Sequence, residues 1–323
     1  MSGEAFKVKL ARLEALRRDG ASESLEADLR KALNDRNNYI VAKAAAVVGA
    51  RDVASLIPDL IATYDRLFDP APNVDPLATG KTAIAQTLKD LGHTDAAVFL
   101  RGARHVQLEP AWKTPVDAAA GLRVTCAHAL VACEIDTFTL LEEFVDLLAD
   151  PEKIVRVEVV RAIGEMGGEG ILLLRLKALS SDPEPEVIGE CFLGLLRRQR
   201  SDAVPFVARF LKATRPDIQF EAASALAASR ESEALGIVKQ FWMTDISPDL
   251  RRAIVFSCGD SPFPEASEFL LSLVGDRREG VGAAALEALG SSRFSDSARE
   301  RALRAAEETH DPKIMRSYAK AFG

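Results

Sequence analysis

The chain lacks the segments that mark a membrane-spanning, secreted or disordered protein. Its 323 residues contain no run near the ~18 consecutive apolar residues of a membrane helix. Residues 1–19 intersperse charged with apolar side chains, so they hold no apolar core of a secretion signal. Because 48% of the residues are hydrophobic, the chain can bury a substantial core, which excludes global disorder.

Aromatic residues and cysteines are also scarce. Only 6% of the residues are aromatic whereas alanine is abundant, and this composition favours close-packed helices over a β-sandwich. The four cysteines, Cys126, Cys133, Cys191 and Cys258, form no C-x-x-C pair, and a chain of this size needs no disulfide. We therefore expect an all-α protein with reduced thiols in the cytoplasm.

The chain has no excess of positive charge. It carries 41 Lys and Arg against 48 Asp and Glu, a formal charge of -7. Such a chain lacks the counterion release that dominates binding to nucleic acid, and it has no field to attract an anionic membrane. We interpret the basic run Arg197-Arg198-Gln199-Arg200 as a solvated helix end. The composition thus argues against nucleic acid and membrane as partners.

Motifs of known catalytic and metal sites are missing. The sequence contains no H-E-x-x-H, G-x-S-x-G or G-x-G-x-x-G, and no two histidines stand four residues apart. Gly80-Lys81-Thr82 resembles the end of a phosphate-binding loop, but Asp75 occupies the position of the required glycine. We interpret Thr79 as the cap of a helix that begins near Lys81. The sequence predicts no catalytic residue, cofactor or metal, and leaves open an enzyme whose groups meet only in the fold.

A repeat of roughly thirty to forty residues runs along the chain. Pro151, Pro183, Pro216 and Pro248 follow one another at nearly constant spacing, and each precedes an Ala-rich segment. Nine residues before the end of each such segment the residue is always apolar: Ile40, Ala83, Val124, Val155, Val187, Phe220, Leu250, Val281 and Ile314. Two further columns on the same helical face are equally apolar. The pattern predicts helices that begin near these residues, each with one continuously buried face.

A second group of apolar residues at helical spacing precedes each of these helices, so the repeating unit is a helical hairpin. The segment Asp150-Pro151-Glu152-Lys153-Ile154-Val155-Arg156, followed by Ala162-Ile163-Gly164, resembles the second-helix signature of the HEAT-repeat family, in particular the short bacterial units of the phycobilisome-lyase type. Leu56-Ile57-Pro58-Asp59-Leu60 resembles the proline-bearing first helix of that family.

The resemblance covers residues 23–323 and implies one α-solenoid of about nine HEAT-like hairpins. Residues 1–22 are predicted to form an N-terminal capping helix that ends at Asp19-Gly20. A single solenoid is favoured over two separate domains. In two units, loops at 68–80 and 105–120 lengthen the connection between the two helices.

These two loops are rich in proline and belong to consecutive units. Equivalent turns of neighbouring repeats lie side by side, so we expect the loops to form one ridge at an edge of the solenoid. Trp112 lies between Pro110 and Pro115, where no helical period assigns it to the core. It is a candidate anchor for a partner protein. Alternatively, it folds down over the edge of the first repeats.

A second candidate surface lies on the helices of three consecutive units. Leu193, Leu226 and Phe256 share a column that projects away from the buried face, toward the concave lining of a solenoid. Arg161 and Glu190 flank this column. An exposed apolar strip of this kind would bind a partner helix or an extended peptide. The alternative is that neighbouring repeats bury all three residues.

Together these features favour a non-enzymatic bacterial scaffold or adaptor. It would bind another protein or a peptide through its concave face and its Pro-rich loop ridge. The resemblance to phycobilin lyases implies an alternative, in which the repeats hold a tetrapyrrole or its acceptor protein. A HEAT-like nucleic-acid-binding protein is the third and weakest alternative.

Overall fold

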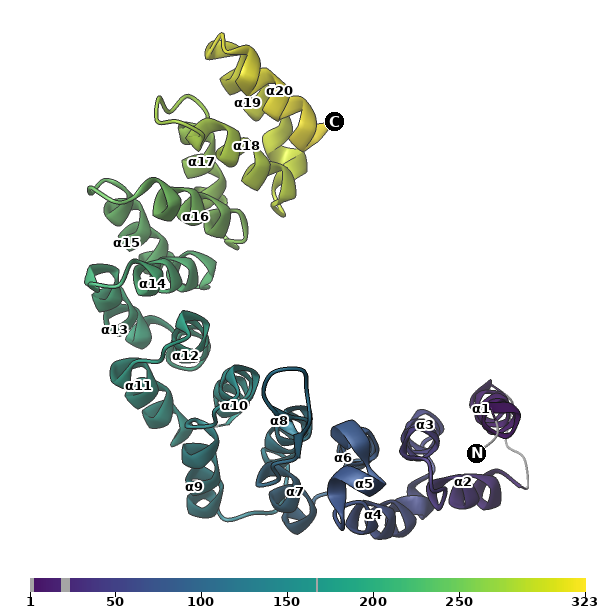
Figure 1. Cartoon of the computed structure of the whole chain (residues 1–323). Helices are drawn as coiled ribbons and strands as arrows, with labels where there is room; N and C mark the ends of the chain where they lie inside the picture. The colour runs from purple at the N-terminus through teal and green to yellow at the C-terminus, as the bar shows by residue number, and fades with distance from the viewer. Residues whose placement is uncertain (1–2, 19–23, 167) are drawn as a thin grey trace. The chain divides into compact units, whose positions relative to one another are not determined.

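Helical hairpins follow one another along the chain in the computed structural model, which describes residues 3–18, 24–166 and 168–323 (Figure 1). The chain divides into two compact units, residues 1–162 and 163–323. The boundary falls inside helix α10 (Lys153–Glu165).

In unit 1, helix α1 (Gly3–Arg18) precedes the first hairpin. The first helices of the hairpins are α2 (Leu25–Leu33), α4 (Ile57–Arg66), α7 (Ala96–Ala103) and α9 (Thr137–Leu147). The second helices are α3 (Asn38–Ala50), α6 (Thr79–Asp90), α8 (Ala120–Leu130) and α10. Figure 1 shows the first helices in one layer and the second helices, together with α1, in the other.

Helix α1 packs against α3 and buries Leu13 and Leu16, as a cap over the end of a helical layer should. The predicted end of this helix at Asp19-Gly20 lies outside the described residues. The short turn η1 (Ala54–Leu56) precedes α4, and between α4 and α6 the chain forms two more, α5 (Ala71–Val74) and η2 (Pro76–Ala78). Between α7 and α8 it forms a small antiparallel ribbon, β1 (Leu108–Glu109) and β2 (Val116–Asp117).

Unit 2 continues the same arrangement. Its first helices are α11 (Gly170–Ser180), α13 (Val204–Ala208), α15 (Ser232–Trp242), α17 (Pro264–Leu273) and α19 (Ser295–Glu308). Its second helices are α12 (Pro185–Gln199), α14 (Pro216–Ala228), α16 (Pro248–Gly259), α18 (Val281–Ser291) and α20 (Pro312–Phe322). The short turns η3 (Arg200–Ala203) and η4 (Arg209–Lys212) flank α13. Consecutive second helices pack on one another from α12 to α20.

The predicted all-α architecture is confirmed, and the second helices begin at or up to four residues before the predicted positions. Four of them begin with a proline, as in α12 and α14. Proline suits the first helical position because an amide hydrogen there would have no acceptor within the helix. No helix passes uninterrupted through Pro151: α9 ends before it and α10 begins after it. In the described ranges, the β-ribbon is the only departure from helices and turns.

The core lies between the two helical layers, with Phe144 and Phe192 among its largest fully buried side chains. Neighbouring second helices approach closely: a Cβ added at Gly290 in α18 would lie 2.5 Å from the carbonyl oxygen of Ala321 in α20. The expected continuous buried face is wrong for α14, where Phe220 is 40% exposed. It is incomplete in α6, α8 and α20, where Ala83, Val124 and Ile314 are only half-buried. No helix within the described ranges is long and apolar enough to cross a bilayer.

Candidate functional site

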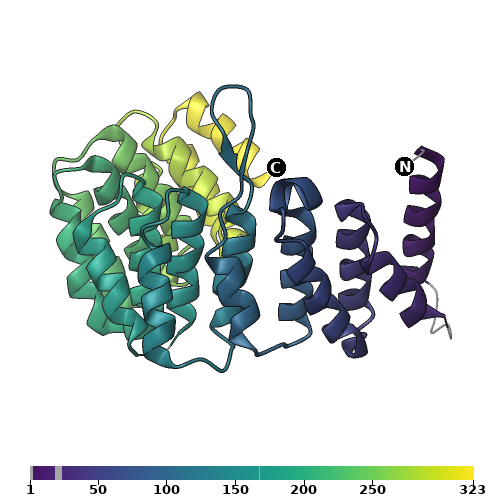
Figure 2. The same cartoon turned by 60° about the horizontal axis from the view of Figure 1, so that its bottom comes forward.

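The loop before α8 projects beyond the ends of α7 and α8 (Figure 2). Its two strands pair Leu108 with Asp117 and Glu109 with Val116, which leaves residues 110–115 as the tip. Trp112 stands in this tip with 97% of its surface exposed. The alternative in which Trp112 folds down onto the repeats is therefore wrong.

A buried ion pair fixes the base of the two long loops. Lys81 and Asp75 are both fully buried, and the Lys81 ammonium lies 3.2 Å from Asp75 Oδ2. The Asp75 carboxylate also accepts hydrogen bonds from the backbone amides of Gly80 (2.7 Å) and Lys81 (2.9 Å). Asp75 thus caps α6, and the interpretation of Thr79 as the cap is wrong, because Thr79 lies inside the first turn. Burial lowers the pKa of Lys81, an effect that the charge of Asp75 opposes.

Gln107 joins the two loops. Its amide oxygen accepts a hydrogen bond from the Lys81 ammonium (2.9 Å), and its amide nitrogen donates to the carbonyl oxygen of Asp75 (2.9 Å). Glu109 on β1 accepts a further bond from the backbone amide of Leu77 in the other loop (2.7 Å). The loops at 68–80 and 105–120 are therefore in contact, and we call them together the loop ridge.

Arg123 of α8 holds the second strand of the ribbon. Its guanidinium binds Asp117 (2.6 Å), both carboxylate oxygens of Asp150 (2.7 and 3.0 Å) and the carbonyl oxygen of His105 (2.9 Å). Burial alone would lower the pKa of Arg123, but its bonds to Asp150 and Asp117 raise it above the ordinary value. Every charge at the base of the ridge is thus compensated, as burial requires.

Apolar side chains on the loop ridge face the solvent instead. Besides Trp112, the exposed large apolar residues of the two loops are Leu77, Val106, Leu108 and Val116. Side chains of this kind on a hydrogen-bonded loop mark a contact surface more often than a single exposed leucine does. The ridge therefore presents an apolar surface on a base that polar bonds hold in place.

The structure divides the predicted strip in unit 2. Leu193 of α12 and Phe256 of α16 are half-buried, whereas Leu226 of α14 is completely buried. The Arg252 guanidinium lies 5.7 Å from the centre of the Phe256 ring. Leu226 is therefore no part of an exposed strip, and its inclusion was an error of register.

The error comes from counting back from the helix end. From their initial prolines, Leu193 and Phe256 are the ninth residues of α12 and α16, but Leu226 is the eleventh residue of α14. Leu195 and Cys258, the eleventh residues of the other two helices, are likewise buried. The ninth residue of α14 is Ser224, so the helix presents a hydroxyl at this position, which accepts a 2.9 Å hydrogen bond from the hydroxyl of Ser257. The direction in which a side chain points depends on its position in the helical turn, so counting from the first residue of each helix places Leu226 on the buried face.

The two flanking charges belong to different units. Arg161 lies in unit 1, where its guanidinium pairs with Glu158 at 2.5 Å. Glu190 lies in unit 2 on α12 and is half-buried. Its negative charge acts on Glu221 of α14, described below.

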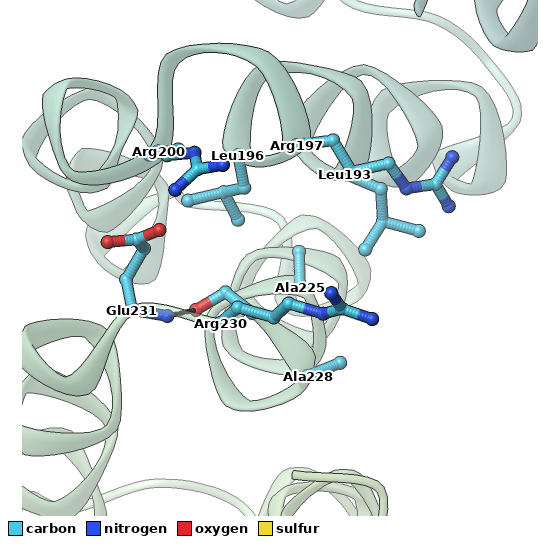
Figure 3. A pocket seen from close by; sticks show the side chains of 9 residues that line it. Leu193, Leu196, Arg197, Arg200, Ala225, Ala228, Arg230 and Glu231 are labelled. Atoms are coloured by element: carbon cyan, nitrogen blue, oxygen red, sulfur yellow. Dashed lines mark hydrogen bonds between the residues drawn. The ribbon is translucent and has the colours of Figure 1, made fainter. Parts of the chain in front are cut away.

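Beside Leu193 lies a well of about 600 Å³ between α12, α14 and the start of α15. Figure 3 shows its lining, which combines three arginines with an apolar floor. The lining residues are Leu193, Leu196, Arg197, Arg200, Ala225, Ala228, Ser229, Arg230 and Glu231. We call this the arginine well. Sequence reasoning saw Arg197 and Arg200 but missed Arg230, which follows them by about one repeat and could have been found by comparing helix ends.

A smaller pocket of about 150 Å³ shares Leu193, Ala225 and Ala228 with the arginine well and contains Glu221 and Asp260. We call it the acidic pocket. Glu221 packs over Gly189, where a Cβ would lie 2.0 Å from the Glu221 Oε2 atom, so a larger residue at position 189 would displace the carboxyl group from its present place. Burial, together with the charges of Glu186, Glu190 and Asp217, raises the pKa of Glu221 to about 7.

Three of the four cysteines, Cys126, Cys191 and Cys258, are buried. Burial raises the pKa of Cys126 and Cys258 to about 12, so their thiols are not ionised nucleophiles at neutral pH. Within the described ranges, no group of three or more His, Cys, Asp or Glu side chains is arranged to hold a metal ion.

Comparison with known proteins identifies the repeat. Residues 172–245 match the family of HEAT repeats, and no curated protein matches the sequence. Among solved structures, Escherichia coli YibA aligns with 15% identity over 87% of this chain and 96% of its own, with a TM-score of 0.47. Human deoxyhypusine hydroxylase in complex with glycerol aligns with 17% identity over 88% of this chain and 90% of its own, with a TM-score of 0.30. The chain therefore contains HEAT repeats, which the family match locates at residues 172–245.

Proposed function

We propose that this protein is a scaffold or adaptor that binds another protein, with the loop ridge as one contact surface. The observation that carries the proposal is the 97% exposure of Trp112 at the tip of a hydrogen-bonded ribbon. Tryptophan buries more area than most side chains and is enriched among the residues that dominate binding energies. Leaving it in water favours a partner that covers it.

The base of the ridge supports the same proposal. Arg123, Lys81 and Gln107 hold the base of the two loops by buried polar bonds, so this base is preformed in the structure of the chain alone. A partner that binds a preformed loop loses less conformational entropy than one that must first order it. The partner would present an apolar pocket large enough for an indole ring.

We also propose a cytoplasmic location, because all four cysteines are free thiols. No particular residue of the described chain supports the tetrapyrrole-lyase alternative. The nucleic-acid alternative is tested below, together with the arginine well.

Affinity capture from the source organism, followed by reconstitution with the purified partner, tests the proposal. Trp112→Ala should weaken the reconstituted complex by about 2 kcal/mol or more, a loss of roughly thirtyfold, and Trp112→Phe should restore part of it. Met243→Ala is the matched control, because Met243 is an exposed apolar residue of the other unit. A complex whose dissociation constant is the same for wild type and Trp112→Ala would refute the ridge as a contact surface.

A further inference from the structure

The three arginines of the arginine well have no partner for their charges. Among the described residues, no hydrogen bond or ion pair engages the side chains of Arg197, Arg200 or Arg230, and all three are exposed. Their neighbour Arg198 differs: its guanidinium donates to the carbonyl oxygens of Gly164, at 2.5 Å, and Glu165. Arg198 thus caps the C-terminal end of α10, whereas the guanidinium groups of Arg197, Arg200 and Arg230 can bind a ligand.

The backbone places one of these arginines in a strained conformation. Arg200 has φ 51° and ψ -127°, a region that side chains other than glycine rarely adopt. This conformation ends α12 and directs the Arg200 side chain to the rim of the well, opposite Arg230 and close to Glu231 (Figure 3). Strain of this kind collects at functional sites, where it serves to aim a side chain.

The floor of the well is apolar. Leu193, Leu196, Ala225 and Ala228 line it, and its volume of about 600 Å³ lies within the range of ligand pockets. A free phosphate or another small anion would meet the guanidinium groups and leave this floor in water. A ligand that uses the whole well carries at least two negative charges and an apolar group between them.

We propose that the arginine well binds an acidic peptide segment of the partner protein, an inference that rests on the proposed function. The carboxylates of the peptide would lie at the three guanidinium groups, and an apolar side chain would lie on Leu193 and Ala225. Arginine pairs with carboxylates through two parallel hydrogen bonds, which gives this recognition its geometry. The C-terminal ends of α12 and α14 each place about half a negative charge near the well. The three arginines and Glu231 together carry a larger net positive charge, so the well remains positive.

The neighbouring acidic pocket decides between a peptide and a nucleic acid. A continuous polyanion that leaves the arginine well would meet the carboxylate of Asp260 and the partly ionised carboxyl group of Glu221, and both negative charges repel it. A peptide can carry acidic residues over the well and a basic or neutral residue over the acidic pocket. The alternation of sign along the two pockets therefore favours a peptide of mixed sequence.

Peptide selection on the intact protein tests this inference. A phage library of random peptides of about twelve residues is selected on the wild type and counter-selected on the Arg197→Gln, Arg200→Gln, Arg230→Gln triple variant. Because all three side chains are exposed, the triple variant should fold as the wild type does, which circular dichroism and the melting temperature will show. The enriched peptides should combine Asp or Glu with apolar residues.

The affinity of a synthetic enriched peptide then tests each residue. Each single arginine substitution should weaken binding about two- to fivefold and the triple substitution roughly ten- to a hundredfold, with a loss of affinity as salt rises. Glu231→Gln should strengthen binding, because it removes a negative charge from the rim. Arg293→Gln, another exposed arginine of unit 2 without a partner among the described residues, should have no effect.

Three outcomes would overturn the inference: no enriched peptide, enriched peptides that bind the triple variant equally, or a single-stranded oligonucleotide that binds more tightly than any peptide and is lost in the triple variant. The natural partner separates this inference from the proposed function. If its complex is weakened by Trp112→Ala and not by the triple substitution, the ridge stands and the well fails. If the opposite occurs, the well stands and the ridge fails.

Discussion

The arginine that supports the loop ridge in unit 1 is buried, whereas the three arginines of the arginine well in unit 2 are exposed. Arg123 is 2% exposed and bonds to Asp117, Asp150 and a backbone carbonyl, so its charge serves the fold. Arg197, Arg200 and Arg230 lie on the surface without such partners. The same residue type therefore supports the proposed apolar contact surface in unit 1 and lines the proposed peptide site in unit 2.

The difference teaches how to distinguish structural from functional charge in a repeat protein. A buried charge must be fully compensated, since an unpaired one costs several kcal/mol, so its partners are visible in the structure. An exposed charge needs no partner to be tolerated. It becomes informative only where several of one sign surround a hollow with an apolar floor.

Arg123→Ala should have the largest effect on stability. It leaves the carboxylates of Asp117 and Asp150 buried without their cation, which costs about 3–5 kcal/mol. Urea unfolding at neutral pH measures this loss. The ribbon should lose its protection against amide exchange at the same time.

Arg293→Ala is the control for that experiment, because Arg293 is exposed, and its cost should stay within about 0.5 kcal/mol. Equal stabilities of the two variants would mean that Arg123 is not the support of the ridge.

Leu226→Ala should have the next largest effect. Leu226 is completely buried, so its truncation removes apolar contacts and leaves a cavity, at a cost of about 2–5 kcal/mol. Phe256→Ala should cost less, because Phe256 is half-buried. Thermal unfolding of both variants measures the difference. If Leu226→Ala melts as the wild type does and Phe256→Ala does not, the corrected register is wrong.

The all-α hairpin architecture could be predicted from the sequence because each repeat shows the same apolar pattern again. Three apolar columns, each with nine members along the chain, located the second helices to within four residues, and the all-α class followed from composition. No helical period assigned Trp112 to the core, but the sequence left open whether its side chain folds down onto the repeats, and only the structure shows that it is exposed. These features depend on local periodicity, which the sequence records directly.

Features that depend on tertiary contacts were predicted less well. The burial of Leu226 depends on where α14 begins, and a two-residue slip in counting moved it to the wrong face. Asp75 caps α6 across a loop, so nearest-neighbour reasoning selected Thr79 instead. The arginine well joins residues from two repeats, and no single segment of the sequence contains it.

Glu221→Gln should change the pH dependence of stability in unit 2. The pKa of Glu221 is about 7 in the folded protein, against an ordinary value of 4.5. The folded state therefore binds more protons between these pH values, so stability falls as pH rises from about 4.5 to 7 and stays lower above. Glutamine cannot ionise and should remove this fall, which makes the variant more stable at pH 8 by about 1–3 kcal/mol.

Melting temperatures of wild type and variant between pH 5 and pH 8 measure this effect. Glu279→Gln, at an exposed position of the same unit, is the control. Parallel melting curves for wild type and Glu221→Gln across that range would contradict the raised pKa.

The smallest effect compares two adjacent arginines. Arg198→Gln removes the bonds to the carbonyl oxygens at the end of α10 and should cost about 0.5–1.5 kcal/mol. Arg197→Gln removes no bond among the described residues and should stay within about 0.5 kcal/mol of the wild type. Chemical denaturation of the two variants in parallel resolves this difference. An equal loss for both would show that Arg197 supports the fold as Arg198 does, and the arginine well would then lack one of its free charges. If Arg197→Gln leaves the free energy of unfolding unchanged and still weakens peptide binding, Arg197 serves binding and not folding. Arg123 in unit 1 would then differ from Arg197 in unit 2, because its charge serves the fold.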